Sequence, residues 1–172
     1  MKKLFKQIKK YPDLIFINGI SIIISLVIYF QFGNKPEISI AIIATGISIS
    51  FGLRQYNIEN DKMFKELFSS FNQKYDEKFN DTLNDIEYKT KENENYKLTL
   101  SESKLLNDYL NFCAEEYLWF SKGRIDNSVW QSWENGMKYY LNIPSIKGFV
   151  KEQELQKDSY YGLFEKLKLN KL

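Results

Sequence analysis

The sequence predicts an all-α protein in which a two-helix transmembrane hairpin precedes a long amphipathic helix and a small helical domain. Two stretches of the first third carry no charge, namely the 21 residues between Asp13 and Lys35 and the 16 residues between Glu37 and Arg54. Beyond Arg54, apolar residues recur every three or four positions, which is the spacing of amphipathic helices. No segment shows the alternation of apolar and polar residues that indicates a strand.

The composition excludes several kinds of chemistry. The 172 residues include no His, which removes imidazole bases, His-ligated metals and Ser–His or Cys–His nucleophile pairs. A single Cys, Cys113, excludes an internal disulfide and a Cys-rich zinc site. The net charge is +4 through residue 37 and −2 from Arg54 onward, which is not the pattern of a nucleic-acid-binding domain. We therefore expect no nucleic-acid partner, no metal and no cofactor.

The first uncharged stretch predicts a membrane-spanning helix over residues 14–32, preceded by a basic segment at residues 1–12. About 20 helical residues cross the hydrocarbon layer, in which every backbone polar group must be paired within the segment. A cleavable signal peptide also begins with lysines and an apolar run. This run is longer than a signal peptide needs, and residues 33–36 lack a small-x-small cleavage pattern.

The second stretch predicts a spanning helix over residues 37–55, opened by Pro36, so that the hairpin covers residues 13–56. A re-entrant segment and a buried core helix are the alternatives. Five lysines precede the first span, one lies in the connecting loop, and three basic residues follow the second span. The positive-inside rule then places both termini in the cytoplasm. Lys is far more frequent than Arg, and Ile and Asn are also frequent, which indicates an AT-rich bacterial genome, so the expected location is a bacterial inner membrane. Aromatic residues mark the two interfaces, Tyr11 and Tyr56 at one and Tyr29, Phe30 and Phe32 at the other.

Small and polar residues form a stripe on each predicted span. The stripes consist of Asn18, Ser21 and Ser25 in the first helix and Ala41, Thr45, Ser48 and Gly52 in the second. Such stripes let helices approach closely in lipid. Either they pack the two helices of one hairpin, or several hairpins assemble with the hydroxyls lining a polar path. Neither of the two uncharged stretches contains an Asp, Glu, Lys, Arg or His, which disfavours a proton relay or an ion transporter.

Residues 57–88 predict one amphipathic helix behind the hairpin. Its apolar stripe is mainly aromatic and consists of Phe64, Phe68, Phe71, Tyr75, Phe79, Leu83 and Ile86. A two-stranded coiled coil prefers Leu, Ile and Val at such positions, so we expect this stripe to pack on the helices that follow. Residues 89–98 have almost no apolar side chains and predict an exposed linker.

Residues 99–172 predict a cytoplasmic helical domain. Its first helix begins with Thr99 and Glu102, which can form a capping box. Asp126 is placed to cap the next helix. A short helix follows, and the last helix is expected over residues 158–169.

Three segments of the chain resemble small bacterial inner-membrane proteins of unknown function: YLNFCAEEYLWFSKGRIDNSVWQSW from Tyr109 to Trp133, IPSIKGFV and SYYGLFEKL. The pattern of these proteins is a membrane-spanning N-terminus, an amphipathic cytoplasmic helix, a helix ending in Lys-Gly-x-Ile-Asp, an aromatic-rich helix and a Pro-initiated tail. The layout is also similar to membrane-anchored accessory proteins of type VI-B CRISPR systems and to other phage-defence effectors. Where those accessory proteins carry an Arg-x4-His ribonuclease-like motif, this chain departs from them because it has no His. The resemblance implies an anchored helical domain without an assigned reaction.

Glu115 and Glu116 lie shortly before Arg124 and form the first candidate polar site. Paired carboxylates can perform acid–base chemistry or hold a metal where the environment separates their pKa values. Only one of two adjacent helical residues can face the core fully, so the structural alternative is a buried glutamate that pairs with Arg124. The planar guanidinium suits bidentate pairing with a carboxylate or a phosphate, which makes Arg124 the foremost candidate for a ligand or partner contact.

Trp119, Trp130 and Trp133 form the second candidate site. Together with nearby tyrosines they can make a cage for a cation or a platform for a base. Core packing is the alternative that we favour, since a small domain needs large apolar side chains to offset the entropy of the chain.

Three functions are compatible with these features, and we expect a protein that is not an enzyme. In the first, the cytoplasmic domain binds a partner protein or its own copies, and the oligomer acts at the lipid bilayer, for example as a membrane-perturbing effector in antiviral defence. In the second, the protein is a membrane-tethered sensor that binds a small anionic ligand near Arg124 and Glu115. The third is a hydrolase with a carboxylate-bound metal.

Overall fold

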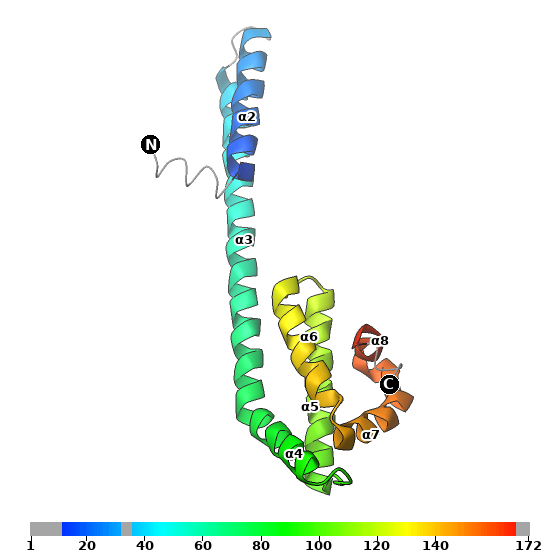
Figure 1. The fold of residues 1–172 in the computed structure, drawn as a ribbon. Helices are drawn as coiled ribbons and strands as arrows, with labels where there is room; N and C mark the ends of the chain where they lie inside the picture. The colour runs from blue at the N-terminus through cyan, green and yellow to red at the C-terminus, as the bar shows by residue number, and fades with distance from the viewer. Residues whose placement is uncertain (1–11, 32–35, 168–172) are drawn as a thin grey trace. The chain divides into compact units, whose positions relative to one another are not determined.

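The computed structural model describes residues 12–31 and 36–167 (Figure 1). Every regular element in these ranges is a helix, so the all-α prediction is confirmed. The chain divides into two compact units, Met1–Lys62 and Met63–Leu172. The predicted basic N-terminus, the interface residues Tyr11 and Phe32 and the loop at 33–35 lie outside the described residues.

The first unit contains helix α2 (Pro12–Gln31) and the beginning of helix α3 (Pro36–Lys78). Each helix starts with a proline, whose missing N–H would have no partner in the first turn. Asp13 and Glu37 follow these prolines, and their negative charge is favourable at the positive end of the helix dipole. Both helices are long and apolar enough to cross a membrane.

The predicted amphipathic helix is divided in the structure. Helix α3 ends at Lys78 and helix α4 covers Asn80–Glu92, while Phe79 between them has φ −114° and ψ −38°. The Phe79 ring is fully buried, and its centroid lies 5.1 Å from that of Phe112. Tertiary packing on this ring explains the break. Helix α4 also covers the start of the linker predicted over residues 89–98, and the segment that connects α4 to α5 is residues 93–99.

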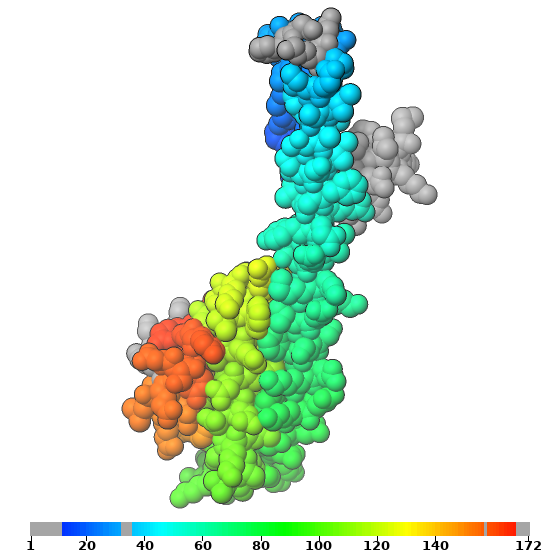
Figure 2. Space-filling model, turned by 180° about the vertical axis from the view of Figure 1, so that it is seen from behind, coloured from blue at the N-terminus to red at the C-terminus, as the bar shows by residue number. Residues whose placement is uncertain are grey.

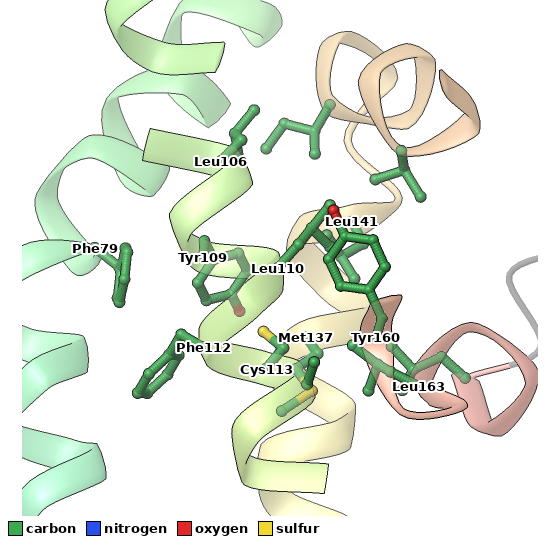
Figure 3. Close-up of a cluster of buried hydrophobic side chains, with 14 of the residues drawn as sticks. Phe79, Leu106, Tyr109, Leu110, Phe112, Cys113, Met137, Leu141, Tyr160 and Leu163 are labelled. Atoms are coloured by element: carbon green, nitrogen blue, oxygen red, sulfur yellow. The ribbon is translucent and has the colours of Figure 1, made fainter. Parts of the chain in front are cut away.

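The remaining helices of the second unit are α5 (Leu100–Ser121), α6 (Asn127–Leu141), α7 (Pro144–Gln153), the 3-10 helix η1 (Glu154–Tyr160) and α8 (Leu163–Leu167). Helices α5 and α6 lie between the C-terminal part of α3 and the α7–α8 segment (Figures 1 and 2). Helix α5 contacts α6, η1 and α8. Core side chains lie on two sides of α5, as Figure 3 shows. Phe79 and Phe112 lie on one side, and Leu110, Leu141 and Tyr160 lie on the other.

A capping box starts helix α5, as the sequence predicts. The Glu102 backbone N–H donates to Thr99 Oγ1 at 3.3 Å, and the Thr99 N–H donates to the Glu102 carboxylate at 2.8 Å. The same buried carboxylate accepts from Lys89 Nζ at 2.9 Å and from the Tyr96 hydroxyl. Burial alone would raise the pKa of Glu102, but these hydrogen bonds outweigh it and lower the pKa to about 2.

The C-terminal segment differs from the single helix expected over residues 158–169. Helix η1 ends at Tyr160, and the next two residues have positive φ values of 53° at Tyr161 and 85° at Gly162. Left-handed residues of this kind stop a helix, and glycine adopts the conformation without a Cβ clash. Helix α8 then begins at Leu163, and the last two positions of the expected helix, 168 and 169, lie outside the described residues.

Candidate functional site

In the first unit, the polar residues of α2 face α3. The Asn18 amide donates to Ser50 Oγ at 2.7 Å, and Ser25 and Ser39 each donate a hydroxyl to the other's backbone carbonyl at 3.2 Å. Gly46 permits this approach, because a Cβ built at this position would lie 2.1 Å from Ser21 Oγ. The packing stripe of α3 is therefore Ser39, Gly46 and Ser50.

The small-residue stripe that the sequence identifies on α3 lies on another face. It consists of Ala41, Thr45, Ser48 and Gly52, all of which are exposed. At about 100° per residue, these positions point about half a turn away from Ser39, Gly46 and Ser50. A Cβ built at Gly52 meets no atom within 4 Å. This stripe therefore does not pack α3 against α2 within one hairpin. The close approach to α2 occurs at Gly46 instead.

The second unit contains a cavity of about 230 Å³ between α3, α5 and α6. Asn72 and Tyr75 of α3 line it, together with Phe112 and Glu116 of α5 and Trp133 and Tyr140 of α6. The Tyr140 hydroxyl donates to Asn84 Oδ1 at 2.8 Å. The cavity thus brings together side chains that are up to 68 positions apart in the sequence, from Asn72 to Tyr140.

Among the described residues that line this cavity, Glu116 is the one with a carboxyl side chain. Its side chain is buried, with 5% exposure of the residue, and no described residue forms a hydrogen bond with its carboxyl group. Burial raises the pKa of Glu116 well above its ordinary value, the charge of Glu115 raises it further, and Lys74 opposes these effects. The carboxyl group therefore stays neutral over a wider pH range than a solvated glutamate.

The other predicted members of the polar site lie elsewhere. Glu115 is exposed and forms an ion pair with Lys74 at 3.4 Å. Arg124 follows the end of α5 and is half-buried, and its backbone N–H donates to the Trp119 carbonyl at 3.0 Å. Neither Glu115 nor Arg124 lines the cavity that contains Glu116. The three residues therefore do not form one site around this cavity.

The three tryptophans also have different surroundings. Trp130 is 1% exposed and stacks on Phe120 with ring centroids 4.8 Å apart, so it is a core residue. Trp119 is half-buried, with Lys122 Nζ 5.2 Å from its ring centroid. Trp133 lines the cavity and stacks on Phe68 at 6.0 Å. The cavity thus includes Trp133 and neither of the other two.

Sequence reasoning missed Asn72, Met137 and Tyr140 as neighbours of Glu116. Their signal was limited to helical periodicity, which assigns each residue to a face of its own helix. Within residues 12–31 and 36–167, no three acidic or cysteine side chains converge as a set of metal ligands.

Comparison with known proteins found no matching family model, no similar curated sequence and no similar solved structure.

Proposed function

We propose that this chain is a membrane-anchored, non-enzymatic protein whose hairpins assemble with copies of themselves in the bilayer. The observation that carries this proposal is the exposed stripe of Ala41, Thr45, Ser48 and Gly52 on α3, which α2 does not cover. In lipid, small residues on a helix surface favour contact with a second helix, because they let the backbones approach.

The exposure of both apolar helices supports the membrane anchor. Only 6% of the most apolar window of α2 and 11% of that of α3 is buried. The core helix of a water-soluble protein would be mostly buried, and soluble proteins rarely expose a large continuous apolar surface. Hydrogen bonds between the helices satisfy Asn18 and Ser25, which hydrocarbon would otherwise leave without partners.

Orientation follows from the charges beside the two apolar stretches. Lysine is abundant before the first stretch, and Arg54, Lys62 and Lys65 follow the second. We therefore place both termini and the second unit in the cytoplasm. The absence of His and of a second Cys from the sequence supports a function without catalysis.

The assembly is tested by measuring the subunit number of the full chain in lipid nanodiscs by mass photometry. The variant Gly52→Leu places a bulky side chain on the exposed stripe and should reduce the oligomer to smaller species. Gly19→Leu is the matched control, because Gly19 lies on α2 and a Cβ there also meets nothing within 4 Å. A wild-type monomer, or an oligomer that both variants leave unchanged, would contradict the proposal.

A second candidate function, a membrane-tethered ligand sensor, is favoured by the cavity in the second unit. The charged group that lines it is an acid rather than Arg124, so this cavity does not favour the anionic ligand expected from the sequence. Thermal shift measurements with nucleotides test the anionic alternative, and stabilisation that Arg124→Gln abolishes would support it.

A further inference from the structure

The position of Glu116 is not explained by packing within the second unit. Buried polar groups in proteins are hydrogen-bonded in the great majority of cases, and buried charges are paired. Glu116 forms no hydrogen bond or ion pair with the described residues, and its carboxyl oxygens are not fully enclosed by protein at the cavity that the residue lines. An unpartnered buried acid in such a place is a candidate binding group.

A second hollow of this unit, lined by charged residues, presents a contrast. It measures about 340 Å³ and is lined by Lys74, Lys78, Asp108 and Glu115, among others. These groups already satisfy one another, with Lys78 Nζ 2.7 Å from Asp108 and Lys74 Nζ 3.4 Å from Glu115. All four side chains are about half exposed, so surface ion pairs account for them.

The surroundings of Glu116 are rich in aromatic rings. Tyr75, Phe112, Trp133 and Tyr140 line the same cavity. The faces of such rings attract cations, and aromatic residues combined with an acid are the usual recognition group for amines and quaternary ammonium ions. Lys74 Nζ already lies 5.3 Å from the centroid of the Phe112 ring. An anion would meet repulsion from Glu116 whenever that group is ionised.

We propose that this cavity binds a small organic cation, an amine or quaternary ammonium ion with an apolar body, and that Glu116 is its counter-charge. The volume of about 230 Å³ exceeds the roughly 150 Å³ of an engineered cavity that holds benzene, so a ring with a short aminoalkyl arm fits. The binding needs neither assembly nor membrane insertion, and it gives the tethered-sensor function a class of ligand.

Binding of the cation is coupled to the release of a proton. Burial favours the neutral carboxyl of Glu116, whereas the cation pairs with the carboxylate, so at a pH where the carboxyl is protonated its proton passes to the solvent as the ion pair forms. The ionisable groups around Glu116 are Tyr109, Cys113 and Glu115 on α5, Lys74 and Tyr75 on α3, and Tyr140 on α6. Of these groups, Glu116 is the one that must be ionised to pair with the cation. The affinity for the cation should therefore keep rising at pH values above the ordinary pKa of glutamate.

Isothermal titration calorimetry of the full chain in detergent tests the proposal. The probes are phenethylamine and tetramethylammonium, and phenethyl alcohol serves as the neutral analogue. Both cations should bind in preference to the alcohol, and two buffers of different ionisation enthalpy should reveal the released proton. Glu116→Gln should weaken cation binding by about 30-fold or more, because it removes one partner of a buried charge pair. Asp108→Asn removes an exposed acid of the same helix that neither lines this cavity nor shifts the pKa of Glu116, so it should leave the affinity unchanged.

A second pair of variants tests the cavity without changing its charge. A Cβ built at Gly136 or at Gly148 meets no atom within 4 Å, but only Gly136 lines the cavity. Gly136→Leu should therefore reduce cation affinity, whereas Gly148→Leu should not.

Three results would overturn the proposal. These are the absence of cation binding at millimolar concentrations, equal affinity of Glu116→Gln and the wild type, and equal affinity for the alcohol and the amine. The nanodisc measurement of subunit number is independent of these titrations, so the failure of cation binding is distinguishable from the failure of assembly.

Discussion

Asn18 and Ser50, 32 positions apart in the sequence, are joined by a hydrogen bond of 2.7 Å from the amide to the hydroxyl. The bond lies on the same face as the contact between Ser21 and Gly46. Polar contacts between apolar helices contribute about 0.6 kcal/mol each on average in a membrane protein, so the close backbone approach must supply much of the remaining stability.

Replacing Gly46 should separate the two helices of the hairpin. In Gly46→Val the new side chain would occupy the position of Ser21 Oγ, which lies 2.1 Å from a Cβ at residue 46. A cysteine pair placed at Ser25 and Ser39 should form a disulfide on oxidation in an otherwise unchanged hairpin and fail to do so with Gly46→Val. Gly52→Val is the control, and an equal loss of cross-linking in both variants would contradict the prediction.

Glu102 should stabilise the second unit at neutral pH. Its pKa of about 2 lies below the ordinary value, so the contribution is present above the unfolded-state pKa and is lost as the pH falls toward 2. Glu102→Gln should lower the free energy of unfolding at pH 7 by about 1–3 kcal/mol, with the difference shrinking in acid. Urea unfolding followed by tryptophan fluorescence measures this unit, which contains all three tryptophans of the sequence. A difference independent of pH would show that the hydrogen bonds do not favour the ionised form.

Glu116 should have the opposite effect. A carboxyl whose pKa is raised on folding contributes stability that is fully present below its unfolded-state pKa and declines as the pH rises toward the folded-state value. Glu116→Gln, which keeps the shape of the side chain, should therefore raise the urea midpoint at pH 8 relative to wild type, and the gain should be smaller at pH 5. A loss of stability at both pH values would indicate that the carboxyl has a structural partner.

Phe79 should be among the most sensitive core positions of the second unit. It is fully buried between α4 and α5, with ring centroids 5.1 Å from Phe112 and 5.4 Å from Tyr109. Phe79→Ala should lower the free energy of unfolding by about 3–5 kcal/mol. Tyr88→Ala, at a 63% exposed position of the neighbouring helix, should change it by about 0.5 kcal/mol or less. Similar effects of both variants on the urea midpoint would refute this account of the kink.

Features with local causes were predictable from the sequence. The capping box of Thr99 and Glu102 depends on residues three positions apart, and the prolines at the start of α2 and α3 act within one turn. The sequence could not show that the helix expected over residues 57–88 breaks at Phe79, because the break depends on packing against α5.

The candidate sites were less predictable for the same reason. On α3, two sets of small residues both recur at helical spacings, and contacts such as the approach of Ser21 to Gly46 decide which set faces α2. The sequence narrows the buried carboxyl to Glu115 or Glu116, since one of two neighbours must turn outward. Glu116 shares its cavity with Trp133 and Tyr140 and not with Arg124. This arrangement depends on how three helices pack, which the sequence does not show.

The glycines of the hairpin should also differ in how natural selection treats them. Gly46 has no space for any side chain, whereas Gly19 and Gly52 have nothing within 4 Å of an added Cβ. Descendants of this gene that keep the two helices together should retain glycine at position 46. Position 19 should accept other residues in any lineage. Position 52 should accept them only in lineages whose hairpins do not assemble with one another.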